Sequence, residues 1–523
     1  MGKKIATKGV NQLRAGVALS YVNLILGNII PIIYTPWMLS LLGKDQYGLY
    51  TSASSIVSYL SLLSLGMGTA VIRYLSKALG ENDIEQYRKL YGLFLNIFRV
   101  IAALCLTAGI VLTFLVDNIY GGNKSASEIE TMRILVLLMS VNVSIGFLFS
   151  PYTSVITSYE KYIFLQIVNI FVSILPAFLN IAVLYIWPSS ISLICVSLTL
   201  NILIRFVYAA YIKKVIKIKP LYKKPETWLL KELFFFTFWV FVATLVNQLQ
   251  SQTDKVIIGY AMEFAWVGIY QIGATFEMIT QNISLNISNV LTPKITKIVS
   301  SLCSEGNMHE IDELLIRIGR IQFYVVSLIV SGFVVFGRQF IYLWVGDEYG
   351  EDCLKAYWVA LLLIVPSVVP LIQNVAYSSI VALNKHKFRS IVYLCVAIAN
   401  VATTIPAVYN MGIVGAALMT NICSVIGTWF VMNWYYWKRI RINIPKFWSV
   451  MLPRFALPAA MTGLGIFASH FIDFSSNLLI LLVGIIVYTI IFFVLNWLIY
   501  MNNYEKDVFR KPVYAVINKI KKK

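Results

Sequence analysis

Charged residues and histidines are scarce in this sequence. Only 13% of the 523 residues are charged and three are histidines, whereas 59% are hydrophobic. Soluble domains usually carry about a quarter charged residues, so this composition excludes a chain of several soluble domains. The six cysteines are dispersed without a C-x-x-C pair, which argues against a disulfide framework or a Cys/His metal site. No G-x-x-x-x-G-K-[ST] sequence occurs, so we expect no cofactor and no ATP bound by a P-loop.

Long apolar runs are what the sequence has instead. Runs of about seventeen residues or more are long enough to cross a bilayer. They predict an all-α integral membrane protein with about fourteen transmembrane helices. The predicted spans are 16–42, 47–72, 90–115, 131–154, 162–187, 191–211, 233–261, 264–291, 321–336, 356–381, 391–409, 412–434, 455–471 and 478–500. We expect the ninth and the thirteenth of these to be short.

The distribution of charge predicts the topology. The chain has 43 Lys and Arg residues against 24 Asp and Glu, a formal charge of +19. Placing the N-terminus in the cytosol puts most of the cations on the cytosolic side and only Lys44, Lys124, Arg338 and Lys355 in the opposite loops. This is a strong positive-inside pattern. It predicts a multi-pass membrane protein with both termini cytosolic, and it leaves little reason to invoke nucleic acid as a partner.

Short sequence matches indicate an internal repeat. Residues 47–50 (YGLY) match residues 267–270 (VGIY), and residues 76–77 (SK) match residues 296–297 (TK), both at the same offset. Six spans per repeat make the two copies parallel, as in some transporters. We therefore expect a six-helix lobe over residues 1–220 and a second over 221–440. Residues 441–523 would add two further helices and a basic cytosolic tail.

Three stretches resemble a known family. Residues 41–50 (LLGKDQYGLY), 65–74 (LGMGTAVIRY) and 252–259 (QTDKVIIG) are similar to the polysaccharide-biosynthesis flippases, which export O-antigen units. These belong to the multidrug/oligosaccharidyl-lipid/polysaccharide exporter superfamily, together with multidrug antiporters and the lipid II flippase. The resemblance implies two six-helix lobes, a location in a bacterial inner membrane and a lipid-linked oligosaccharide as substrate. Fourteen helices, instead of the twelve usual for many O-unit flippases, would match the lipid II flippase.

Ionisable residues inside predicted spans are candidate functional residues, because an ion in hydrocarbon costs roughly 2.5–3.5 kcal/mol unless a wet cavity or a partner receives it. We expect Arg99, Arg205 and Lys255, together with Arg73 at the cytosolic edge, to line a cationic substrate cavity. Snorkelling of Arg205 and lipid anchoring by Arg73 are the competing interpretations. Asp254 and Glu277 are candidates for proton or sodium coupling, although a carboxylate neutralised by a structural cation fits equally well.

Polar residues repeat at helical spacing within several spans. They include Asn96, Asn169, Asn201 and Gln281. Each recurs with other polar residues three, four or seven positions away, which places them on one helix face. Such a face either lines an aqueous lumen or bonds a neighbouring helix, and the sequence leaves both open.

These patterns favour a flippase that moves an anionic polyprenyl-diphosphate-linked oligosaccharide, an O-antigen, capsule or exopolysaccharide unit, by alternating access. Arginine suits phosphate because its planar fork donates paired hydrogen bonds. Membrane lipids and a polysaccharide polymerase are expected partners. A multidrug-type cation antiporter and a lipid II flippase are the alternatives. A membrane-embedded glycosyltransferase would need a carboxylate or metal constellation, for which the acidic segment 347–352 is a poor candidate, so we expect no enzyme.

Overall fold

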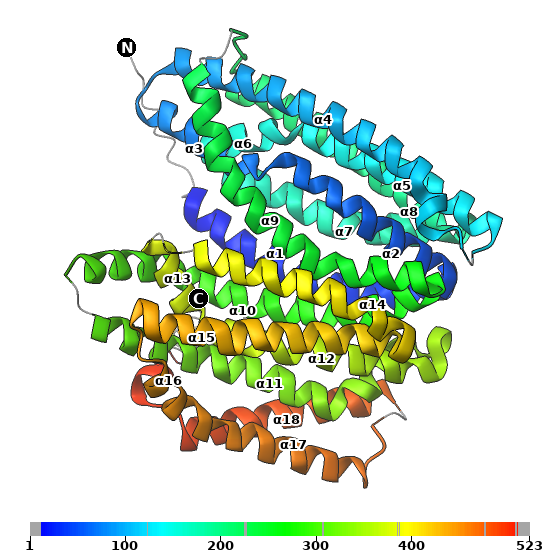
Figure 1. Cartoon of the computed structure of the whole chain (residues 1–523), viewed down its shortest axis with the longest axis vertical. Coiled ribbons are helices and arrows are strands. Elements are labelled where there is room, and N and C mark those ends of the chain that lie inside the picture. The colour runs from blue at the N-terminus through cyan, green and yellow to red at the C-terminus, as the bar shows by residue number, and fades with distance from the viewer. Residues whose placement is uncertain are drawn as a thin grey trace, which may run out of the picture. The chain divides into compact units, whose positions relative to one another are not determined.

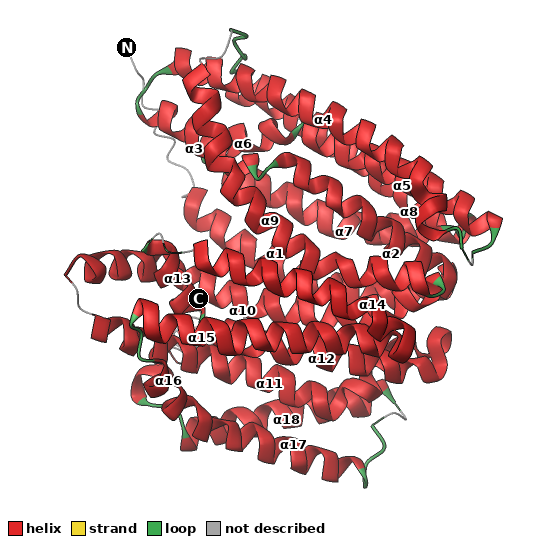
Figure 2. Ribbon diagram, in the orientation of Figure 1, coloured by secondary structure: helices red, strands yellow, loops and turns green. Residues whose placement is uncertain are grey.

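The computed structural model describes residues 12–122, 124–223, 227–305, 308–383, 385, 387–474, 477–507 and 510. The chain divides into two compact units, Met1–Gly268 and Ile269–Lys523, which we call the first and the second unit. The described residues form helices and connecting loops without a strand (Figure 2). The predicted all-α architecture is therefore confirmed.

The first unit is a bundle of helices in which α4 packs along α5 and α1 packs along α7 (Figure 1). Its elements are α1 (Gln12–Leu42), α2 (Lys44–Ser58), η1 (Tyr59–Ser64), α3 (Met67–Gly80), α4 (Ile84–Tyr120), α5 (Ala126–Leu148), α6 (Ser150–Ser158), α7 (Tyr162–Ile186), α8 (Ser190–Tyr211), η2 (Ile212–Ile216) and α9 (Thr227–Ala261). Two clusters of buried apolar side chains, centred on the aromatic residues of α4 and on the contact of α2 with α5, hold these helices together.

In the second unit α11 is the central helix, and α12, α17 and α18 all pack against it. The elements are α10 (Phe264–Glu305), which starts at the end of the first unit, α11 (Met308–Tyr349), η3 (Gly350–Asp352), α12 (Cys353–Ile372), α13 (Asn374–Ala382), α14 (Lys387–Ser424), η4 (Val425–Val431), α15 (Met432–Tyr435), η5 (Tyr436–Ile440), α16 (Ile444–Met451), η6 (Leu452–Phe455), α17 (Ala456–Ser469) and α18 (Leu478–Ile499). The α14 segment is two helices joined at Gly412, whose φ of 62° and ψ of −148° lie in a region essentially reserved for glycine.

Ten helical segments of the described chain are long and apolar enough to cross a membrane, so the protein is a multi-pass membrane protein. Two of them, Glu310–Ile372 with 63 residues and Lys387–Ile440 with 54, each contain more than one helix. Because about 20 residues suffice for one crossing, each has room for two. The total of fourteen crossings stays a prediction.

The same sequence of local features occurs in both units. Helix α5 breaks at Phe149 in the first unit and α12 breaks at Gln373 in the second, and a nine-residue helix follows each break. Each unit also has a π-helical turn, η2 or η5, that ends at a basic residue in the left-handed conformation, Lys217 at φ 59° and Arg441 at φ 68°. The internal repeat is thus visible in irregular backbone, which apolar composition alone does not produce.

Aromatic packing repeats as well. The Phe164 ring stacks on Tyr211 at 3.7 Å between centroids, and the Phe388 ring stacks on Tyr435 at 4.2 Å. Phe388 follows Phe164 in the sequence by the same number of residues as Tyr435 follows Tyr211, so the two stacked pairs occupy equivalent positions. The lobe boundaries at residues 220 and 440 remain predictions, because the compact units divide at residue 268 instead and thus group α9 with the first six spans.

Two expectations about individual helices are wrong. The ninth span, predicted to be short at 321–336, is the 42-residue α11, which runs through most of the loop expected at 337–355. Charged residues near both ends of α11 ended the apolar run in the sequence without ending the helix. The second span, predicted as one helix over 47–72, is broken between α2 and α3. This break is associated with the close packing of Gly66 against Val240 on α9.

Candidate functional site

The break in the second span is irregular backbone inside a predicted crossing. After α2 the chain forms the 3-10 turn η1, and Leu65 and Gly66 then adopt the left-handed conformation at φ 49° and 66° before α3 begins. At Gly66 a Cβ atom would lie 2.2 Å from Cγ1 of Val240 on α9, so only glycine fits. Irregular backbone at membrane depth is tolerated where it is buried in protein or lines a water-filled cavity. Transporters place substrate and ion sites at such interruptions.

Polar side chains gather on this break. A 3-10 helix has three residues per turn, so Ser58, Ser61 and Ser64 line up along one side of η1. The Gln248 amide on α9 donates to the Ser58 hydroxyl, and the hydroxyls of Tyr59 and Thr253 share a hydrogen bond at 2.7 Å. These bonds fasten α9 to the interrupted helix.

Two of the predicted site residues come directly after Thr253. Asp254 and Lys255 are buried, with 2% and 8% of their surface exposed. The Lys255 ammonium donates to the Gln252 amide oxygen at 3.3 Å on the same helix. A carboxylate and an ammonium therefore lie in the interior of the first unit, next to the broken helix. Burying a charge is costly unless it is paired or hydrogen-bonded, which makes this part of α9 a functional candidate.

Arg205 occupies a second polar position of the first unit, between α8 and α5. Its Nε donates to Oδ1 of Asn201 at 2.9 Å, and the Asn201 amide donates to the side chain and the backbone oxygen of Asn142 on α5, at 2.7 and 3.1 Å. The Arg205 side chain is half-buried, and its hydrogen-bond acceptor is the uncharged amide oxygen of Asn201. Within the described chain no ion pair neutralises this guanidinium.

The remaining predicted cations lie on more accessible surfaces. Arg73 on α3 and Arg99 on α4 are exposed. Arg99 donates to Oδ1 of Asn96 at 3.0 Å and to the Tyr222 hydroxyl at 3.3 Å, and its Cζ lies 5.4 Å from the centre of the Tyr222 ring. Tyr222 belongs to the segment between η2 and α9, which also bonds α4 from Leu221 to the Arg88 carbonyl. Arg99 thus holds the connecting segment against α4.

Glu277 and Gln281 form a bonded pair on α10. The Gln281 amide donates to the Glu277 carboxylate at 2.7 Å, and both side chains are half-buried. Asn169 lies exposed on α7, where its backbone oxygen accepts from the Ser173 hydroxyl at 3.0 Å. The structure therefore pairs Asn96 with Arg99, Asn201 with Arg205 and Gln281 with Glu277.

The second unit contains an apolar cavity of about 550 Å³. It lies between α11, α17 and α18, and its lining includes Phe336, Met461, Leu464, Val483 and Val487. Such a cavity suits a hydrocarbon chain, because it offers dispersion contacts and hardly any polar partners. The two helices outside the predicted repeat form most of it.

A lysine in the connection between α4 and α5 reaches the end of α9. Lys124 donates to the backbone oxygen of Met262, and its Nζ lies 4.6 Å from the Phe264 ring centre. Partial burial lowers the pKa of the Lys124 ammonium, which nearby Glu128 and Glu263 offset in part. This contact ties two connections of the first unit together.

Sequence reasoning missed several of these residues. The sequence could have indicated Asn142 as a candidate, because it is an amide inside the predicted span 131–154. Gln248 and Thr253 gave no signal beyond ordinary helical polarity. Tyr222 lies in a connecting segment, so its contact with Arg99 depends on how that segment folds back along α4.

Comparison with known proteins identifies relatives. A family model described as "Polysaccharide biosynthesis protein" matches residues 13–299. A Shigella flexneri protein described as an O-antigen transporter is 22% identical over 402 residues, which cover 76% of this chain and 90% of the relative. Among solved structures, the lipid II flippase MurJ in an inward closed conformation matches with a TM-score of 0.62 and 17% identity, covering 95% of this chain and 99% of MurJ. An inward-facing multidrug resistance transporter of the MATE family matches with a TM-score of 0.65 and 13% identity, over 81% of this chain and 96% of that one. The fold is that of these transporters.

Proposed function

Because the chain belongs to the polysaccharide biosynthesis protein family, we propose that it is a flippase for an anionic, polyprenyl-diphosphate-linked oligosaccharide in a bacterial inner membrane. Both termini face the cytosol in this proposal, as the positive-inside distribution of Lys and Arg predicts. The relative described as an O-antigen transporter supports this class of substrate. The proposal also covers capsule and exopolysaccharide units, which share the same lipid diphosphate.

The observation that carries the proposal is the guanidinium of Arg205. It lies half-buried within a crossing, held by the Asn201 amide at 2.9 Å and without an ion pair in the described chain. A positive charge left unneutralised in low-dielectric surroundings attracts an anion more strongly than an exposed one does. The fork of arginine donates two parallel hydrogen bonds to a phosphate. A cationic drug would meet repulsion at this position.

The remaining predicted residues enter the proposal in graded roles. Lys255, beside the broken second helix, adds a second buried cation for the diphosphate, and Arg99 and Arg73 add accessible ones. Asp254 and Glu277 are the candidates for coupling to protons or sodium. The apolar cavity between α11, α17 and α18 can hold part of the lipid tail. The two units would alternate access to the substrate by moving against each other.

The test is translocation of a lipid-linked oligosaccharide in vesicles that contain the purified protein. Wild type should flip the oligosaccharide diphosphate, and Arg205→Ala should flip it at least tenfold more slowly, since a charge-assisted hydrogen bond contributes about 1.5–3 kcal/mol. Lipid II and a cationic dye are the comparison substrates. Faster movement of lipid II would assign the chain to cell-wall synthesis, and cation-driven dye efflux would make it a drug antiporter; either result contradicts the proposal.

A further inference from the structure

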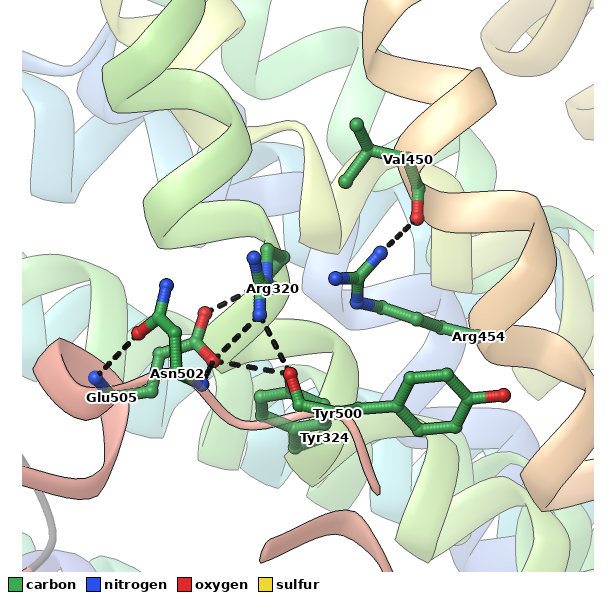
Figure 3. Close-up of polar contacts among 7 residues, drawn as sticks. All are labelled: Arg320, Tyr324, Val450, Arg454, Tyr500, Asn502 and Glu505. Carbon is green, nitrogen blue, oxygen red and sulfur yellow. Dashed lines mark hydrogen bonds and ion pairs between the residues drawn. The ribbon is translucent and has the colours of Figure 1, made fainter. Parts of the chain in front are cut away.

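The chain beyond α18 is fastened to α11 by a buried ion pair. The Glu505 side chain has no exposed surface, and its Oε1 lies 2.7 Å from Nε of Arg320. Its other oxygen accepts from Nη2 of Arg320 at 2.8 Å and from the Tyr324 hydroxyl at 3.2 Å. Figure 3 shows Arg320 between this carboxylate and the backbone oxygen of Tyr500, which accepts a further bond at 2.8 Å.

The same carboxylate starts a helical turn. The Asn502 N–H donates to Glu505 at 3.0 Å, while the Glu505 N–H donates to the Asn502 side chain at 2.9 Å. This reciprocal arrangement is a capping box. One side chain therefore both begins the turn and attaches it to α11. We call residues 500–507 and Arg510 the C-terminal clasp.

The clasp places cations on aromatic rings. Lys506 Nζ and Arg510 Cζ lie 5.8 and 5.0 Å from the centre of one ring, that of Trp497 at the end of α18. From the neighbouring helices, Arg454 lies 5.7 Å from the Tyr500 ring and Arg317 lies 4.7 Å from the Tyr504 ring. Figure 3 shows Arg454 bonded to the Val450 carbonyl, on the side of Tyr500 away from Glu505. Cations within about 6 Å of a ring face are attracted to it, so these contacts fix where the charges point.

Basic side chains outnumber acidic ones in these contacts. The contacts involve Arg317, Arg320, Arg454, Lys506 and Arg510, and the clasp itself contains two acidic residues, Glu505 and Asp507. Glu505 is already paired with Arg320. The cations on Trp497 and Tyr500 therefore retain an excess of charge that a phosphate can complement.

Exposed apolar side chains lie directly beside these cations. Leu498 is 70% exposed and Ile499 is 60% exposed, one turn or less from Trp497. Aromatic residues next to Lys and Arg at the end of an apolar helix are typical of the membrane interface. A free anion or a nucleic acid would leave the leucine and isoleucine uncovered, whereas the acyl chains of a phospholipid would cover them.

We propose that Trp497, Lys506 and Arg510 form a binding site for the headgroup phosphate of an anionic phospholipid. The acyl chains of that lipid lie along Leu498 and Ile499. The buried Arg320–Glu505 pair is the positioning element, since it holds the clasp where both cations reach the Trp497 ring. This site is independent of the transported substrate.

The test measures lipid binding by the full-length protein. Purified protein in detergent is titrated with phosphatidylglycerol, with phosphatidylcholine and with inorganic phosphate, and bound lipid is read by native mass spectrometry. The variants are Lys506→Gln with Arg510→Gln, and Glu505→Gln alone. The matched control, Lys213→Gln with Lys214→Gln, removes two exposed cations from η2 of the first unit. Gel filtration and melting temperature verify folding of each variant.

We expect phosphatidylglycerol to bind wild type and the control equally and the clasp double variant roughly tenfold more weakly, because two nearby cations are lost. Glu505→Gln should also weaken lipid binding, because it breaks the ion pair that positions the clasp. This variant keeps Lys506 and Arg510, so the loss of a cation could not explain weaker binding. Equal losses in both double variants would show general surface attraction and overturn the site. If phosphatidylcholine bound as tightly as phosphatidylglycerol, the ligand would not be an anionic phospholipid. The same conclusion would follow if inorganic phosphate displaced phosphatidylglycerol from the protein.

Discussion

The two units share an asparagine contact but differ in the residue one helical turn beyond it. In the first unit the Asn201 amide donates to the Asn142 carbonyl at 3.1 Å, and in the second the Asn421 amide donates to the Leu362 carbonyl at 2.7 Å, both across the same separation in sequence. Four residues after each asparagine stands Arg205 in the first unit and Val425 in the second. Both units have the asparagine bond, and only the first has the cation one turn beyond it.

The second long helix differs in the same direction. In the first unit it is interrupted at η1 and Gly66, whereas its counterpart α10 continues unbroken from Phe264 to Glu305. Both the unneutralised guanidinium of Arg205 and this interruption of the second long helix thus belong to the first unit. The two units thus share helical contacts and differ in the polar groups that they carry. The second unit contains the buried pair that holds the C-terminal clasp.

Ion-pair burial gives the largest expected difference between the units. Glu505→Ala in the second unit should lower the free energy of unfolding by about 3–5 kcal/mol, because it leaves Arg320 buried without its partner. Asp117→Ala in the first unit removes the exposed partner of Arg133 and should cost at most about 1 kcal/mol. Titration of purified protein with SDS measures both. Equal losses would mean that the buried pair is no tighter than the exposed one.

The interrupted helix gives the next largest effect. Gly66→Ala should destabilise the first unit by about 2 kcal/mol or more, since an L-residue at this φ is strained and its Cβ would strike Val240. Gly68→Ala is the matched control, because no atom lies within 4 Å of its Cβ position and alanine favours helix over glycine. The same SDS titration applies. If Gly66→Ala left the free energy of unfolding unchanged, the interruption would be able to become a continuous helix like α10 without an energetic cost.

Transport should distinguish the positions after the two asparagines. Arg205→Ala is expected to slow oligosaccharide flipping by at least about tenfold, and Val425→Ala should leave the rate per folded molecule unchanged, because only the arginine offers a charge-assisted bond. Arg205→Lys should fall between them, since lysine keeps the charge and loses the planar fork. Translocation in vesicles measures all three. If Val425→Ala also slowed flipping, both units would contribute residues that act in transport.

The smallest expected effect is a pH dependence confined to the first unit. Burial lowers the pKa of Lys124 below its usual 10.5. Between the lowered value and 10.5 the unfolded chain holds more protons than the folded one, so stability should rise with pH across that window. Lys124→Gln should flatten this rise. Lys355→Gln, which removes a lysine paired with Asp352 in the second unit, should leave it in place, and a rise unaffected by Lys124→Gln would contradict the assignment.

The sequence predicts those parts of the molecule that depend on composition and short spacing. Apolar runs locate candidate crossings, whereas the orientation that the loop charges indicate stays a prediction. Helical spacing also pairs Asn201 with Arg205 and Asn96 with Arg99, and the structure shows both bonds. These features are local, so a window of a few residues contains all the information they need.

Features that depend on distant contacts are not predicted. The interruption at Gly66 reflects packing against Val240, far away in sequence. Arg320 ends an expected loop in the sequence, yet Glu505 pairs with it and α11 continues through it. The basic tail expected at Lys519 to Lys523 lies outside the described residues. Tertiary partners, rather than local propensity, decide each of these positions.

The turn at Gly412 has a practical consequence for experiments on topology. Because two helices meet there at one residue whose φ and ψ only glycine adopts, an epitope or an enzyme reporter inserted at this point would force the hairpin apart and report on a damaged protein. The connection that follows α17 is exposed at residues 471–473 and offers a gentler insertion point. Fusions placed there, and not at the glycine hairpin, are the ones whose accessibility will reflect the native orientation.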